Sequence, residues 1–137
     1  MITRRILEKL PPALVRPIVP FLQTIHDRAA VEIQRGCTQG RRFCQAGMIY
    51  RPTRERSPED VVQAARELMR NTGYDELSLL SLSTTDHSQI VPMINQLTST
   101  FDDLKVGIPS TRVDSFSVDV ANAVAKGKKH TLTLAPE

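Results

Sequence analysis

Two cysteines near the start of the chain, Cys37 and Cys44, frame the residues with the clearest potential for chemistry. Thiolates are soft ligands, and three of them in a tight loop can hold a [4Fe–4S] cluster while one iron stays open for a substrate. A thiolate at position 41 would complete the spacing C-x3-C-x2-C, but Arg41 stands there and cannot ligate iron. The spacing alone leaves a second interpretation open, in which both cysteines are ordinary small buried residues.

The residues around the cysteines carry a specific resemblance. The run VEIQRGCTQGRRFCQAGMIYRP, residues 31–52, is followed by RERSPE and a predicted helix. It resembles the first strand and cluster loop of radical S-adenosylmethionine (radical SAM) enzymes. More narrowly, it resembles the cobalamin-binding radical SAM group of Fe–S oxidoreductases, whose loop reads G-C-T-x-G-C-R-F-C-Q-A-G-M-I-Y-R-P. Segments 71–83, 112–117 and 134–137 resemble the same group, so the likeness covers roughly residues 17–137.

The resemblance implies roles for residues of the cysteine loop. Cys37 and Cys44 match two cluster ligands, and Phe43 matches the aromatic position before the last ligand. In this superfamily the open iron binds S-adenosylmethionine, whose reductive cleavage yields a 5′-deoxyadenosyl radical that attacks a C–H bond. Because Arg41 replaces the middle cysteine, the resemblance implies that cluster binding and turnover are impaired here. A second hypothesis is a non-catalytic α/β binding or assembly module that has lost its cluster.

Further contacts with the cofactor are implied at the ends of two later strands. Ser83 and Thr84 occupy the place where the resembling enzymes hold the methionyl amino group. Glu137 ends a strand where polar residues of the superfamily meet the ribose or the amino group. From the residues alone, the segment around Ser83 is equally a plain turn in which Asp86 or Ser88 caps the next helix.

Strand and helix patterns alternate along the chain and predict an α/β fold. The strands are expected at Ala29–Gly36, Glu76–Ser83, Leu104–Pro109 and His130–Leu134, and the helices at about residues 57–70, 88–101 and 117–126. Such crossovers predict a parallel sheet with four strands and three intervening helices. With the resemblance, this plan becomes a partial (β/α) barrel that is truncated relative to the six strands of radical SAM folds.

The segments that follow parallel strands meet at one edge of the sheet. We therefore expect four segments on one rim, namely the cysteine loop and residues 83–86, 110–112 and 136–137. Arg112 would pair there with an anion or with Asp114. Between Gly36 and Arg56 the sequence shows no sustained period, as expected of backbone that wraps around a bulky ligand.

Residues 1–28 lie outside the alternating pattern. Four prolines after Leu10 enforce extended chain, so we interpret this part as an N-terminal linker or packing arm. Residues 29–137 are then the N-terminal part of the barrel, a fragment whose partners are the missing remainder of the barrel and a small-molecule or unknown substrate. In the resembling group a separate cobalamin-binding domain commonly precedes the barrel, and none fits into residues 1–28.

The composition fits one soluble globular domain, since 40% of the 137 residues are hydrophobic and 24% are charged. No apolar stretch approaches the roughly 20 residues of a membrane span, and a reducing, cytoplasmic compartment would suit a thiolate cluster. Residues 1–56 carry 11 basic and 4 acidic residues, a net +7, whereas residues 57–137 carry a net −4. A basic half is typical of nucleic-acid binding, but this one lacks interleaved aromatic residues. Nucleic-acid association is therefore a third hypothesis, which the composition favours less than the other two.

Overall fold

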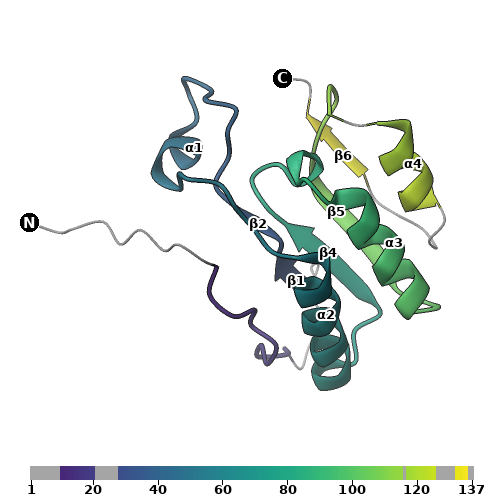
Figure 1. The fold of residues 1–137 in the computed structure, drawn as a ribbon. Coiled ribbons are helices and arrows are strands. Elements are labelled where there is room, and N and C mark those ends of the chain that lie inside the picture. The colour runs from purple at the N-terminus through teal and green to yellow at the C-terminus, as the bar shows by residue number, and fades with distance from the viewer. Residues whose placement is uncertain (1–9, 21–27, 116, 126–131, 136–137) are drawn as a thin grey trace, which may run out of the picture.

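A four-stranded parallel sheet forms the centre of the computed structural model, which describes residues 10–20, 28–115, 117–125 and 132–135. The sheet has the order β1-β4-β5-β6 (Figure 1), with β1 at Ala29–Glu32, β4 at Glu76–Leu80, β5 at Lys105–Arg112 and β6 at Leu132–Ala135. Each neighbouring pair of strands is parallel. This confirms the predicted α/β class and the parallel sheet, and closure into a partial barrel stays a prediction.

Three helices connect these strands and lie side by side (Figure 1): α2 at Pro58–Thr72, α3 at Ile90–Thr100 and α4 at Val118–Ala125. Ser57 caps α2 because its Oγ accepts a hydrogen bond from the Asp60 N–H at 3.1 Å. Gly73 ends α2 in the left-handed conformation, which glycine adopts without strain. Within the described part of the chain, no helix has the length and apolar character needed to cross a bilayer.

Alternate residues of the central strands form the core beneath the helices. The register aligns Ala29 of β1 with Leu77 of β4 and Val106 of β5, and all three side chains are buried. Apolar residues that recur at helical spacing on α2 and α3 pack against these strand residues, including Val61, Ala65, Leu68, Met93, Ile94 and Leu97. The opposite face of the sheet carries Glu32 and Leu80 in register at the carboxyl ends of β1 and β4. This second face leads to the cavity described below.

The cysteine loop stands on a short antiparallel ladder that the sequence did not indicate. Strand β2 at Gln34–Arg35 pairs with β3 at Arg54–Glu55, and the short helix α1 at Gln45–Ile49 lies between them. The segment between the two strands projects from the sheet (Figure 1). The predicted strand Ala29–Gly36 is therefore two strands, because the chain leaves the parallel sheet after Glu32 and pairs with β3.

Two other strand ends differ from the prediction by three residues each. Strand β4 ends at Leu80 rather than Ser83, because Thr84–Asp86 form a turn of 3-10 helix, η1. Strand β5 continues through Pro109 to Arg112, so residues 110–112 belong to the strand rather than following it. The register with β6 shifts between Ile108 and Thr111, and this irregularity accommodates a proline that has no N–H to donate.

The described part of the N-terminal segment, residues 10–20, lies against α2. Pro11 O accepts a hydrogen bond from Arg56 Nη2 at 2.9 Å, and Val15 O accepts one from Asn71 Nδ2 at 2.8 Å. Ala13 and Val15 pack against the core. These contacts are those of a packing arm, and the assignment of residues 1–28 as a separate unit stays a prediction.

At Gly36 the first end of the cysteine loop passes against the backbone of its other end, residues 50–53, and we call this contact the Gly36 crossing. Its φ is +92°, and a Cβ there would lie 2.6 Å from Tyr50 O, 2.9 Å from Pro52 O and 3.0 Å from Thr53 Cα. Residues with a side chain avoid a positive φ, and no carbon atom fits at 2.6 Å from an oxygen. Only glycine permits this crossing.

We expect Gly36→Ala to lower the free energy of unfolding by at least about 2 kcal/mol, because the strained φ and the overlap with backbone add. Gly73→Ala is the matched control, since Gly73 also has a positive φ, +76°, but no atom lies within 4 Å of the added Cβ. Its expected cost is about 1 kcal/mol. Urea unfolding followed by circular dichroism measures both, and equal losses would contradict a tight crossing.

Candidate functional site

Both predicted thiol ligands lie in the loop between β2 and α1. Cys37 is buried, with 4% of its surface exposed, and its Sγ accepts a hydrogen bond from the Gln39 N–H at 3.5 Å. Cys44 is half-buried and directly precedes α1. Its N–H donates to Arg41 O at 3.0 Å, which closes a turn over residues 41–44. The two thiols therefore share one loop but differ in exposure.

The donor set of this loop does not fit a cluster with three thiolate ligands. Among the residues described in the structure, no three His, Cys, Asp or Glu side chains form a group that could hold a metal ion. The middle position is Arg41, a cation without a lone pair for iron. Phe43, which matches the aromatic position of the resembling loop, is 81% exposed. Glu137 lies outside the described residues.

Asp86 joins the cysteine loop to the end of β5. Its Oδ2 accepts one hydrogen bond from Gln39 Nε2 and another from Arg112 Nη1, both at 2.9 Å. The side chains of Arg112 and Asp86 are only 13% and 16% exposed, so water screens this ion pair less than a surface pair. The cysteine loop, η1 and β5 thus meet on one rim, as expected, through a carboxylate that the sequence offered only as a helix cap.

Arg112 also donates a hydrogen bond to Asp114, in agreement with one of its two predicted pairings. This bond is the main reason that the pKa of Arg112 lies above its ordinary value, and the nearby charge of Asp86 adds to it. The same bond lowers the pKa of Asp114. A permanent cation therefore stands between two carboxylates at the end of β5.

Ser83 and Thr84 are both buried at the carboxyl end of β4. Thr84 Oγ1 donates to Leu79 O at 3.3 Å and lies 3.1 Å from Ser81 Oγ, so its hydroxyl is used within the fold. Ser83 Oγ has no hydrogen-bond partner among the described residues, which leaves its bonding capacity unused. Contact of either residue with a cofactor stays a prediction.

The alternative interpretation of this turn, as the cap of the next helix, is wrong. The N-cap of α3 is Gln89, which makes no side-chain capping bond. Ser88 instead donates its N–H at 3.0 Å, and also its hydroxyl, to the Glu55 carboxylate of β3. His87 Nδ1 accepts the Gln89 N–H at 3.0 Å, so Nε2 carries the proton and donates to Arg56 O at 3.1 Å. His87 and Ser88 therefore fasten this turn to residues 55 and 56, where the chain leaves the cysteine loop.

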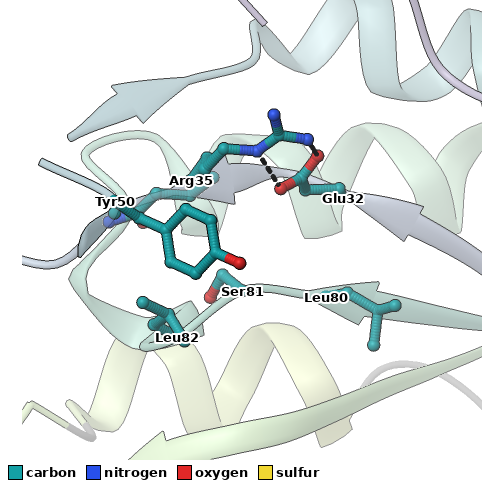
Figure 2. Close-up of a pocket in the computed structure, with 8 residues that line it drawn as sticks. Glu32, Arg35, Tyr50, Leu80, Ser81 and Leu82 are labelled. Carbon is teal, nitrogen blue, oxygen red and sulfur yellow. Dashed lines mark hydrogen bonds and ion pairs between the residues drawn. The ribbon is translucent and has the colours of Figure 1, made fainter. Parts of the chain in front are cut away.

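A cavity of about 520 Å³ opens at the carboxyl ends of β1 and β4, a volume typical of small-molecule sites. It is lined by Glu32, Gln34, Arg35, Gly36, Tyr50, Leu80, Ser81 and Leu82 (Figure 2). Arg35 donates two hydrogen bonds to Glu32, at 2.7 and 2.6 Å, and this contact raises the pKa of Arg35. Gln34 Oε1 is buried without a partner among the described residues. Sequence reasoning missed this cavity because the ladder that brings Tyr50 to it has no sequence pattern.

Comparison with known proteins gives partial matches. No protein-family model matches the chain. An uncharacterized protein of Methanocaldococcus jannaschii is 36% identical over 109 residues, which are 78% of this chain and 23% of that protein. The tRNA-2-methylthio-N(6)-dimethylallyladenosine synthases of two Staphylococcus epidermidis strains are each 28% identical over 116 residues, 80% of this chain and 22% of each synthase. The chain thus spans less than a quarter of the curated relatives that it matches, and the similarity agrees with the radical SAM resemblance as a distant relationship.

We expect Asp86→Ala to loosen the cysteine loop, because Gln39 of the loop loses its hydrogen-bond acceptor. The change also removes the carboxylate that forms a mostly buried ion pair with Arg112. If the free energy of local opening of the loop falls by about 1.4 kcal/mol, amide hydrogen exchange in residues 37–49 becomes about tenfold faster. Asp75→Ala is the control, since it removes an ion pair to Lys105 in which the Asp75 side chain is 69% exposed. Unchanged exchange in Asp86→Ala would contradict the role of this carboxylate.

The Asp114 carboxyl predicts a pH dependence with a defined sign. Its folded pKa is lowered, so its contribution to stability is present above the ordinary value of about 3.9 and is lost as the pH falls through the folded pKa. We expect Arg112→Gln to return this pKa toward about 3.9, since the hydrogen bond from Arg112 is the main cause of the shift. A carbon-13 NMR titration of the Asp114 carboxyl measures the change, and an identical titration in the variant would refute the assignment.

Proposed function

We propose that this chain is part of a radical SAM catalytic domain whose cluster loop is impaired as written. The observation that carries the proposal is the position of the loop. Cys37 and Cys44 lie in a segment that Gln39 ties to Asp86 at the carboxyl rim of a parallel sheet. In (β/α) folds the active sites occupy that rim. A 520 Å³ cavity opens beside the same strand ends.

The partial relatives support the same class. Two of them are named as synthases of a methylthio-modified tRNA nucleoside, and tRNA methylthiotransferases are radical SAM enzymes. An intact loop of this class binds a [4Fe–4S] cluster that takes S-adenosylmethionine. The finer assignment, to the cobalamin-binding group, rests on the loop sequence around Cys44, and any cobalamin would bind in a separate domain. We place the protein in the cytoplasm, where thiols stay reduced.

Arg41 limits what we propose for this chain. Two thiols and a guanidinium are not a donor set for a [4Fe–4S] cluster, so we derive no catalytic step from the loop as it stands. The substitution favours a second function, a non-catalytic α/β binding or assembly module. The Gly36 crossing and the Gln39 to Asp86 hydrogen bond support this alternative, because they order the loop with protein groups alone.

Anaerobic reconstitution with iron and sulfide tests the proposal. We expect Arg41→Cys to bind about four iron atoms per chain and to show thiolate-to-iron charge-transfer absorbance, because it completes the set of three thiolates. The wild-type chain is expected to bind little iron, since it offers two thiols. Iron analysis and visible absorbance after desalting measure both.

Arg42→Cys is the matched control, because it adds a thiol to the same loop with the wrong spacing. Its iron content should stay at the wild-type level. Equal iron in the two variants would mean adventitious binding to thiols. No iron in a folded Arg41→Cys chain would reject the cluster scaffold and leave the binding module.

A further inference from the structure

The packing arm, residues 10–20, and the second half of α2 form a small surface pocket away from the cysteine loop. The hydrogen bond from Asn71 Nδ2 to Val15 O holds the arm against this half of the helix (Figure 1) and places Arg16 beside it. Because α2 ends just before β4 begins, the pocket lies toward the amino end of that strand, whereas the cysteine loop lies at the carboxyl rim. We call it the arm pocket. Its volume is about 210 Å³, and it is lined by Arg16, Gln63, Arg66, Glu67, Arg70 and Asn71.

Three arginine side chains line the arm pocket. Arg66 and Arg70 are one turn apart on α2, and like charges at this spacing repel each other. Arg16 brings a third guanidinium from the arm. Within the part of the chain that the structure describes, none of the three forms a hydrogen bond or an ion pair. An anion bound between them would offset their repulsion.

Glu67 is the one carboxylate in the lining, and a neutral side chain holds it. Its Oε1 accepts a hydrogen bond from Gln63 Nε2 at 2.8 Å, and among the described residues it forms no ion pair. Three guanidinium groups and one carboxylate give the lining a net charge of +2. A dianion neutralises this charge, whereas a carboxylate ligand or a phosphodiester, each a monoanion, leaves half of it. The lining therefore favours a compact dianion.

We propose that the arm pocket binds the dianion of phosphate or of a phosphomonoester. A guanidinium group binds phosphate oxygens through two parallel N–H donors, and here such groups come from both the arm and the helix. A phosphate is only a few times larger than a water molecule, whose share of liquid volume is about 30 Å³, so the pocket also has room for the start of an ester group. The free anion and a phosphorylated organic molecule share this chemistry, and the experiment distinguishes them.

Isothermal titration calorimetry with inorganic phosphate and with phenyl phosphate tests the proposal on the chain as it is. Dimethyl phosphate, a monoanion, is the comparison ligand, and we expect it to bind at least about tenfold more weakly than either dianion. Arg16→Gln and Arg66→Gln should each weaken phosphate binding about tenfold, because each removes a charged donor. Arg42→Gln is the matched control, since it removes the charge of an exposed arginine on the cysteine loop. Its expected effect is below about twofold.

Glu67→Gln gives a prediction of the opposite sign. We expect the affinity for phosphate to rise roughly threefold, because the amide removes a repelling charge while its oxygen still accepts the bond from Gln63. Damage to the fold does not raise affinity, so this gain identifies the pocket as the binding site. Glu59→Gln is the matched control, since Glu59 is exposed in the first turn of the same helix. Its expected effect is below about twofold.

Several outcomes would overturn the proposal. They are equal affinity for dimethyl phosphate and the dianions, equal losses in Arg42→Gln and Arg66→Gln, no gain in Glu67→Gln, and no saturable binding at all. Tighter binding of phenyl phosphate than of inorganic phosphate would identify a phosphorylated organic molecule as the ligand, and equal or weaker binding would identify the free anion; both results support the proposal. Failed iron incorporation in Arg41→Cys would reject the proposed function and leave this inference standing, since the arm pocket contains no residue of the cysteine loop.

Discussion

The close approach of Gly36 to the backbone of residues 50–53 is the constraint on which the cysteine loop depends. A separation of 2.6 Å between a would-be Cβ and Tyr50 O means that the two ends of the loop touch through backbone alone. Because the ends are joined there, β2 and β3 can pair directly beneath the crossing. Tyr50 serves both features, since its carbonyl faces Gly36 while its side chain lines the cavity. The projecting segment and the cavity are thus two results of one crossing.

The far side of the loop is held by electrostatics rather than by packing. Asp86 accepts hydrogen bonds from a neutral amide, Gln39, and from a cation, Arg112, which itself reaches a second carboxylate. Arg112 therefore balances the charge of Asp86, and the tie to the loop comes from an uncharged donor.

The periodic parts of the chain could be predicted from the sequence, and the aperiodic parts could not. Helix α2, residues 58–72, follows a capping serine, Ser57, and has a proline at its first position and apolar residues on one face, so local interactions determine the helix. The ladder of β2 and β3 has two residues per strand, too few for any period to appear. Topology predicted that the strand ends would converge, but the partners of Asp86 and Ser88 come from residues more than 25 positions away. Only tertiary structure selects those partners.

The cysteine loop could be ordered either by metal ligation or by contacts between protein groups, and Arg41 leaves only the second. Where three thiolates surround a cluster, metal binding contributes to folding, and the ligands take their positions around the iron. In this chain the order comes from the Gly36 crossing, from Asp86 and from the Ser88 bonds to Glu55, none of which needs a metal ion. These contacts therefore hold the loop with protein groups alone. Arg41 itself is a permanent cation next to Arg42, and it offers no soft ligand for iron.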